Sequence, residues 1–181
     1  MEGDSMLQIV ILVFLIGCSA FFSASETALT SLSRIRLRTM LEEKVPQAEV
    51  INRLLSDPNR LLSSILVGNN LVNISASSLA TTLAISFFEG DSGSGVGFAT
   101  AIMTVLILIF GEITPKTIAA QKAEKVAIFV ARIISFIIWL FTPIVYILGI
   151  VTGFLTKLFG CNPDQHAPLI TEAELRTIVD V

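Results

Sequence analysis

Charged residues are scarce in this sequence. Asp, Glu, Lys and Arg make up 15% of its 181 residues, whereas hydrophobic residues make up 53%. Long apolar runs with so few charges exclude an ordinary soluble domain and predict helices that span a membrane. The net charge is only −3, and no basic stripe is interleaved with aromatic residues, so we expect no nucleic-acid partner.

Cysteine and histidine are also rare. The sequence holds two cysteines, Cys18 and Cys161, and one histidine, His166, and these form no CxxC or Cys/His cluster. A structural zinc site is therefore not expected. Any metal site must be built from oxygen ligands, which favours Mg²⁺, Ca²⁺, Mn²⁺ or Na⁺. The sequence also lacks nucleotide-binding loops and the motifs of hydrolases and metalloproteases, so we do not expect an enzyme.

Three stretches have the length and composition of membrane spans, at about residues 6–29, 60–88 and 96–114. Basic residues cluster just after the first span, within 34–44, whereas the loop 89–95 has no Lys or Arg. By the positive-inside rule the 34–44 segment is cytoplasmic, and the N-terminus lies outside. The sequence thus predicts an all-α, multi-pass protein of the cell inner (plasma) membrane with a cytoplasmic C-terminus.

Two further regions are expected at the cytoplasmic side. Amphipathic patterning predicts juxtamembrane helices over about residues 32–56. The apolar stretch 126–159 is interrupted at Pro143 and has basic residues near both ends, so we expect a membrane-embedded, re-entrant hairpin, with two complete spans as the alternative. We therefore assign residues 1–160 to a membrane domain. Residues 161–181 are polar and begin a helix pattern that the last residue cuts short, as expected for the start of a cytoplasmic region.

Polar residues recur inside the predicted spans, at levels where they can meet in the inner half of a helix bundle. They are Ser23 and Ser25 in the first span, Asn70 and Asn73 in the second, and Gly111 and Glu112 at the end of the third. Small and amide residues in membrane helices often serve only as contacts between helices, and serine hydroxyls often bond to their own backbone. Three such groups at compatible depth also fit a cavity lined by oxygen atoms.

The stretch 111–116 carries the strongest indication of a site. Glu112 is an ionisable residue at or near membrane depth, which is costly and by default a functional hypothesis. Pro115 lacks an amide hydrogen and can free the carbonyl of Gly111, about four residues upstream. A carboxylate beside a free carbonyl suits a hard cation, with Lys116 at the cytoplasmic mouth. The alternative is that Glu112 only marks the membrane exit and Pro115 only ends the helix.

Three motifs resemble the signatures of one transporter family. Ser-Ala-Ser-Glu-Thr-Ala at 23–28, Val-Gly-Asn-Asn-Leu-Val-Asn at 67–73 and Gly-Glu-Ile-Thr-Pro-Lys at 111–116 are similar to those of the CorC/CNNM (cyclin M) magnesium transporters, in their DUF21 membrane domain. The resemblance implies a homodimer with three transmembrane helices per subunit and cytoplasmic belt helices. It also implies an ion site formed by Ser23, Ser25, Asn70, Asn73, the Gly111 carbonyl and Glu112.

The same resemblance implies export of Mg²⁺ coupled to Na⁺ entry, with Na⁺ at the same or a neighbouring site. In this family an acidic helical region normally leads into paired CBS modules, which are absent from the sequence. Two other functions stay open at this point. One is a passive divalent-cation channel, and the other is a membrane-anchored dimeric regulator that senses Mg²⁺ or ATP for another transporter. The expected partners are the lipid bilayer and a second copy of the chain.

Overall fold

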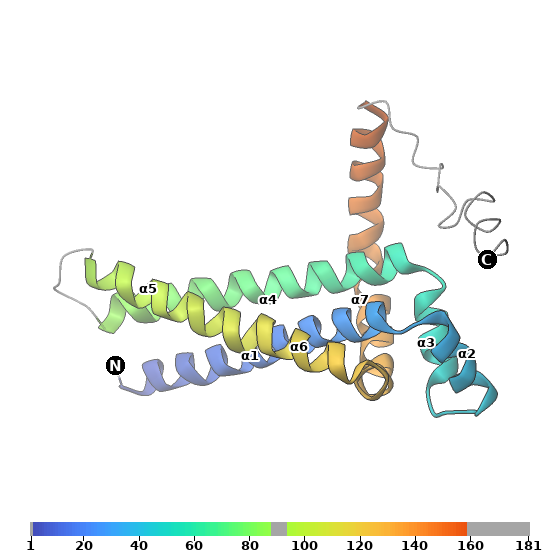
Figure 1. The fold of residues 1–181 in the computed structure, drawn as a ribbon. Coiled ribbons are helices and arrows are strands. Elements are labelled where there is room, and N and C mark those ends of the chain that lie inside the picture. The colour runs from blue at the N-terminus through green and yellow to red at the C-terminus, as the bar shows by residue number, and fades with distance from the viewer. Residues whose placement is uncertain (1, 88–93, 159–181) are drawn as a thin grey trace, which may run out of the picture. The chain divides into compact units, whose positions relative to one another are not determined.

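The computed structural model describes residues 2–87 and 94–158, and every element in these two ranges is a helix. The elements in chain order are α1 (Glu2–Ser31), α2 (Arg34–Glu42), α3 (Ala48–Leu55), α4 (Pro58–Phe87), α5 (Ser94–Ile107), the π-helix η1 (Leu108–Ile113), α6 (Thr114–Gln121) and α7 (Ala123–Leu158) (Figure 1). The predicted all-α architecture is confirmed. The predicted outside loop, up to residue 93, and the region 161–181 lie outside the described residues.

The chain divides into two compact units, Met1–Val145 and Tyr146–Val181, and the two cores, the polar layer and the pocket described below belong to the first. Three long segments of this unit lie side by side: α1, α4 and the run α5–η1–α6 (Figure 1). Helices α1 and α4 are antiparallel, because Leu12 shares a cluster with Ala80 while Phe22 lies against Gly68. A Cβ at Gly68 would lie 2.5 Å from the Phe22 ring, so glycine permits this close approach.

The third segment runs parallel to α1. Ser19 of α1 contacts Gly111 of η1, and Glu26, about two turns further along α1, pairs with Lys116 of α6. The three segments therefore alternate in direction along the chain. This arrangement brings the polar positions of all three segments to neighbouring levels.

Three described stretches are long and apolar enough to cross a membrane: Ser5–Ser31, Val96–Gln121 and Ala123–Leu158. The first two coincide with the predicted spans 6–29 and 96–114. Helix α4 is not among them because it carries many serines and asparagines, although its 30 residues would measure about 45 Å at about 1.5 Å per residue. A helix of this kind at membrane depth must turn its polar groups toward other helices.

Helix α7 differs from the hairpin predicted over 126–159. It is helical without interruption from Ala123 to Leu158, with Pro143 inside it, so no turn forms at that residue. A proline removes one backbone hydrogen bond, and polar neighbours can compensate for the loss in a membrane helix. The carbonyl four residues before Pro143 is that of Trp139, whereas the Thr142 hydroxyl donates to the Ile138 carbonyl at 2.7 Å and accepts a hydrogen bond from Arg60 of α4 at 2.6 Å. The bond from Arg60 ties α7 to α4 beside the proline.

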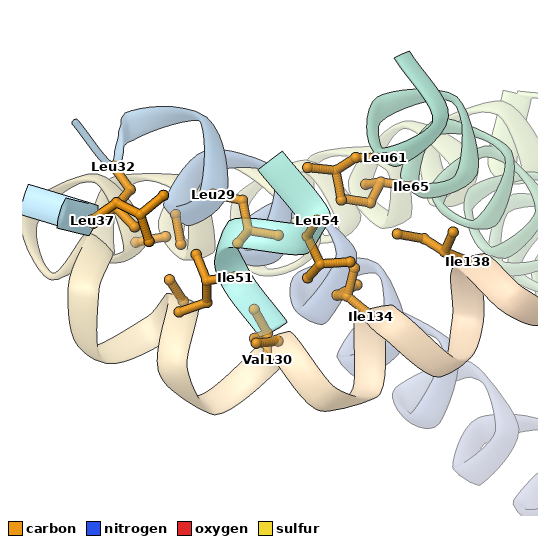
Figure 2. Close-up of a cluster of buried hydrophobic side chains, with 14 of the residues drawn as sticks. Leu29, Leu32, Leu37, Ile51, Leu54, Leu61, Ile65, Val130, Ile134 and Ile138 are labelled. Carbon is orange, nitrogen blue, oxygen red and sulfur yellow. The ribbon is translucent and has the colours of Figure 1, made fainter. Parts of the chain in front are cut away.

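Two clusters of apolar side chains hold this unit together. The larger one, the juxtamembrane core, joins the end of α1, helices α2, α3 and α6, and the first turns of α4 and α7 (Figure 2). Its largest fully buried members are Leu29, Met40, Ile51, Leu61, Ile65 and Ile134. Burial from water of one such side chain contributes about 1.5–3 kcal/mol. Helices α2 and α3 thus occupy the stretch predicted as juxtamembrane helices and are packed through their apolar faces.

The smaller cluster, the bundle core, lies further along the three long segments. Leu12 of α1 packs there with Ala76, Ala80 and Leu83 of α4. Met103 of α5 and its neighbours border this cluster. Small side chains let membrane helices approach closely, where dispersion contacts rather than the hydrophobic effect hold them together.

Candidate cation site

A polar layer separates the two cores. On α1 it falls between Leu12 of the bundle core and Leu29 of the juxtamembrane core. Its serines, Ser19, Ser23 and Ser25, have no exposed surface. Buried hydroxyl groups cost free energy unless they are hydrogen-bonded or bind something else, so the partners of each serine decide its role.

Ser19 is the centre of this layer. Its Oγ lies 2.6 Å from Oδ1 of Asn73 on α4 and 3.2 Å from the carbonyl oxygen of Gly111 on η1. A hydroxyl carries one proton and can donate it fully to only one acceptor at a time. Three oxygen atoms from three segments therefore converge on a single proton. Such an excess of acceptors suits a cation with oxygen ligands.

Ser19 is absent from the set of site residues predicted from the sequence. It lies inside the apolar run of the first span, where a single serine resembles the small residues of helix contacts. A signal was present in the spacing, because Ser19 stands four residues before Ser23 and hence on the same helix face. The spacing from Ser23 was therefore the one signal for Ser19, because the residues next to it in the sequence are apolar and do not suggest a polar site.

The π-helix η1 presents the Gly111 carbonyl to α1. Its wider turn is visible in the bond from the Thr114 amide to the Ile109 carbonyl, five residues back. Single π-turns inside α-helices occur often at functional sites. Gly111 is buried, and a Cβ there would lie 3.0 Å from Ser19 Oγ, so the absence of a side chain permits the contact. Pro115 follows in the first turn of α6, where its missing amide leaves a carbonyl of the preceding turn without a backbone donor.

Ser23 and Asn69 extend the polar layer by one turn. Among the described residues, the buried Ser23 Oγ and Asn69 Oδ1 have no hydrogen-bond partner. Ser23 follows Ser19 by one turn, and Asn69 precedes Asn73 by one turn on the antiparallel helix, so both lie on the same side of the Ser19–Asn73 pair. A buried polar group without a partner costs about 1–3 kcal/mol. These two oxygens are thus available to a bound ion or its water.

Ser25 and Asn70, both predicted as site residues, are placed differently. The Ser25 hydroxyl donates to the Phe21 carbonyl of its own helix at 2.6 Å. Asn70 is exposed, whereas Asn73 is half-buried and contacts Ser19. The structure therefore brings together Asn73 and Gly111 from the predicted set, with Ser23 one turn away, and leaves Ser25 and Asn70 out of this group.

Glu112 takes part in an ion group at the end of the layer. Nζ of Lys116 lies 3.1 Å from Oε1 of Glu112 and 3.6 Å from Oε2 of Glu26 on α1. All three side chains are partly exposed. The lysine ammonium therefore occupies the position of a cation between two carboxylates. An ion that used Glu112 would have to compete with Lys116.

The chemistry of this donor set is that of a hard cation. No group of three or more His, Cys, Asp or Glu side chains within 2–87 and 94–158 could hold a metal ion. The available ligands are hydroxyl, amide and carbonyl oxygens from Ser19, Ser23, Asn73 and Gly111, with one nearby carboxylate from Glu112. Mg²⁺ and Na⁺ accept such ligands, whereas softer metals prefer sulfur or imidazole.

Residues 10–181 match the Cyclin M transmembrane N-terminal domain. The chain belongs to the cyclin M family. It is 42% identical to a UPF0053 protein of Haemophilus influenzae over 94% of this chain and 40% of that protein. It is 41% identical to the UPF0053 inner membrane protein YfjD of Escherichia coli over 89% of this chain and 37% of that protein.

Plant relatives show the same pattern. A chloroplastic DUF21 domain-containing protein of Arabidopsis thaliana is 38% identical over 95% of this chain and 26% of that protein. The chain thus spans less than half the length of these curated relatives. The resemblance drawn from the three sequence motifs is confirmed, and the chain is a membrane protein of the cyclin M family with several apolar, membrane-length helices.

Proposed function

We propose that this protein transports Mg²⁺ across the membrane through the polar layer between its two cores. The convergence of Ser19 Oγ, Asn73 Oδ1 and the Gly111 carbonyl oxygen carries the proposal, because two acceptors compete for the single proton of the Ser19 hydroxyl. A bound cation would supply the positive charge that this arrangement lacks. Ser23 adds an unpartnered oxygen one turn away. Membership of the cyclin M family supports the choice of ion.

The charge of the site bears on the transport mechanism. Mg²⁺ prefers octahedral geometry at about 2.0–2.1 Å and keeps several of its waters. With Glu112 as the carboxylate of the layer, bound Mg²⁺ retains one unit of positive charge, whereas Na⁺ is neutralised. We therefore propose that the two ions compete for one site, which couples Mg²⁺ export to Na⁺ entry.

Lys116 has a part in this exchange. Its ammonium group is paired with Glu112, so ion binding requires this pair to open. Glu26 is a second carboxylate within reach of the same ammonium and can hold it when Glu112 turns to the ion. Lys116 thus acts as a tethered competitor at the cytoplasmic mouth of the site.

The test is Mg²⁺ flux in sealed vesicles, with and without an opposing Na⁺ gradient. The matched pair of variants is Asn73→Ala and Asn70→Ala, which differ in whether the amide contacts Ser19. We expect Asn73→Ala to lower the flux by roughly 10–100-fold, the range for loss of a supporting contact at a metal site. The Asn70→Ala variant should keep most of the flux.

Three other results of the flux experiment would contradict the proposed ligand or the proposed Mg²⁺/Na⁺ exchange. Equal losses in both variants would overturn the assignment of Asn73 as the ligand. Flux that ignores the Na⁺ gradient would identify a passive divalent-cation channel instead of an exchanger. A folded protein that moves no Mg²⁺ in any form would leave the regulator of another transporter as the function.

A further inference from the structure

A second polar feature lies away from the cation site, between α3, α4 and α7. It is a pocket of about 200 Å³. Its lining consists of Arg53, Leu54, Asp57, Arg60, Leu61, Ser135, Ile138 and Trp139. None of these residues takes part in the polar layer around Ser19, so a ligand of this pocket would bind separately from the proposed cation site.

The wall of the pocket is basic. Neither Arg53 nor Arg60 forms an ion pair with an acidic group of the described residues, whereas Arg36 and Arg38 pair with Glu124 and Glu42. Both pocket arginines are exposed. The pocket therefore offers two guanidinium groups whose positive charge is not paired with a carboxylate of the described residues.

The one acid in the pocket is engaged at the start of α4. Oδ1 of Asp57 accepts the backbone amide of Arg60 at 3.1 Å, which caps the helix. The guanidinium of Arg60 is directed toward α7, where Nη2 donates to the Thr142 hydroxyl at 2.6 Å. The charges of the lining side chains sum to about one positive unit, since two arginines face one aspartate. Ser135 adds a hydroxyl group.

The floor of the pocket is apolar. Leu54, Leu61 and Ile138 line it and also belong to the juxtamembrane core (Figure 2). Trp139 closes one side, with 68% of its surface exposed. Exposed tryptophan side chains are typical of the headgroup level of a membrane, where one edge is apolar and the other wet. An occupant with an anionic group next to an apolar part would match both the wall and the floor.

The position of the pocket at the junction of α3 and α4 indicates on which side of the membrane it lies. It forms where the amphipathic helix α3 ends and the long helix α4 begins. The basic segment 34–44 shortly before it puts this end of the bundle on the cytoplasmic side. Cytoplasmic leaflets carry anionic lipids, and basic pockets between membrane helices on that side bind their headgroups.

We propose that this pocket binds the phosphate group of an anionic lipid headgroup, with Arg53 and Arg60 as its ligands. The first carbons of the acyl chains lie against Leu54 and Ile138, and Trp139 borders the bound lipid. Guanidinium groups suit phosphate because they donate parallel, charge-assisted hydrogen bonds. This site is independent of the proposed transport of Mg²⁺.

Trp139 provides the probe for this proposal because it is the only tryptophan of the chain. The purified protein is reconstituted in phosphatidylcholine vesicles that contain either brominated phosphatidylglycerol or brominated phosphatidylcholine. At equal amounts of the two brominated lipids, we expect the anionic lipid to quench Trp139 fluorescence more strongly. The binding constant of the anionic lipid relative to phosphatidylcholine should be several-fold above one. The double variant Arg53→Gln/Arg60→Gln should lose this preference.

A matched double variant controls for unspecific attraction. Lys122→Gln/Lys125→Gln removes the same charge from exposed positions that do not line the pocket, and it should keep the preference. Because Arg60→Gln also breaks the bond to Thr142, the single variant Arg53→Gln is measured as well and should weaken the preference without unfolding the protein.

Inorganic phosphate in the buffer distinguishes the two sources of the anion. We expect millimolar phosphate to leave the lipid preference unchanged. If phosphate abolishes it in the parent protein, the pocket serves a soluble phosphate and the lipid assignment is overturned. Equal quenching by both lipids, or equal losses in the two double variants, would overturn the proposal as a whole.

Discussion

The juxtamembrane core and the polar layer around Ser19 are neighbours in the same bundle and differ in how their atoms are satisfied. The core is filled by aliphatic side chains such as Ile51 and Ile134, which have no exposed surface and no polar atoms to pair. The polar layer contains Ser23 and Asn69, whose oxygens lack partners within the described residues. The first region is built for stability, whereas the second keeps binding capacity at a cost in stability.

This comparison predicts that substitutions in the two regions affect different measurements. Changes in the juxtamembrane core should alter the free energy of unfolding and leave transport per folded molecule intact. Changes that remove an oxygen ligand from the polar layer should lower transport per folded molecule and have little effect on the free energy of unfolding. Four substitutions test this division, in order of decreasing effect.

The largest effect is expected for Ile51→Ala in the juxtamembrane core. Ile51 is fully buried between α3 and its neighbours, so the variant leaves a cavity that costs about 2–5 kcal/mol. Ile35→Ala is the control, because Ile35 is 81% exposed and its loss should cost less than about 0.5 kcal/mol. Thermal unfolding in detergent measures both. Equal melting temperatures for the two variants would show that this core does not hold the bundle.

Gly111→Ala in the polar layer is expected to lower both stability and transport, because it adds a methyl group where α1 and η1 are in close contact. The new methyl group would lie 3.0 Å from Oγ and 3.3 Å from Cβ of Ser19, and such overpacking costs about 1–3 kcal/mol. It would also displace Ser19 from its carbonyl partner and lower Mg²⁺ flux. Gly17→Ala on α1 is the control, since a Cβ there meets no atom within 4 Å. A fully active and stable Gly111→Ala protein would contradict the close contact.

Ser23→Ala separates stability from function most clearly. Removal of a buried hydroxyl without a partner should leave the free energy of unfolding unchanged or raise it by up to about 1 kcal/mol. Mg²⁺ flux should fall in the same protein, because the proposed site loses one of its oxygen ligands. Parallel unfolding and flux measurements decide this prediction. A loss of stability with unchanged flux would identify Ser23 as a packing residue.

The smallest effect is expected for Lys116→Met. The variant removes the ammonium that competes for Glu112, so Mg²⁺ affinity should rise several-fold while stability changes little. Lys122→Met, at an exposed position near the end of α6, controls for the loss of one positive charge. Titration of the two proteins with Mg²⁺ checks the difference. Weaker binding by Lys116→Met would mean that Lys116 supports the site instead of competing for it.

Much of the fold could be predicted from the sequence, because hydropathy and basic segments reflect the membrane directly. Spans 6–29 and 96–114 are set by composition, and the juxtamembrane stretch predicted over about residues 32–56 by its periodicity. Pro143 was misleading, since membrane helices tolerate an internal proline and α7 continues through this one. The neighbouring Thr142–Arg60 contact, which ties α7 to α4, joins residues 82 positions apart and has no local signature.

The candidate site could be predicted by segment but not by residue. The three motifs mark the helices that meet, yet neighbouring positions on one helix face different ways. Asn70 and Asn73 have the same side chain and lie in the same predicted span. Only the rotation of α4 about its axis relative to α1 leaves Asn70 exposed and pairs Asn73 with Ser19. The same rotation buries Ser19, for which the sequence offered only one signal, its position four residues before Ser23 on the same helix face.

The central claim is that Ser19, in contrast to the equally buried Ser25, belongs to a Mg²⁺ site. Titration calorimetry of purified Ser19→Ala and Ser25→Ala with Mg²⁺ tests it directly, because both serines are fully buried and only Ser25 bonds to its own backbone. The structure predicts at least roughly tenfold weaker binding for Ser19→Ala and parent-like binding for Ser25→Ala. Unchanged binding in Ser19→Ala, or equal losses in both variants, would contradict the claim.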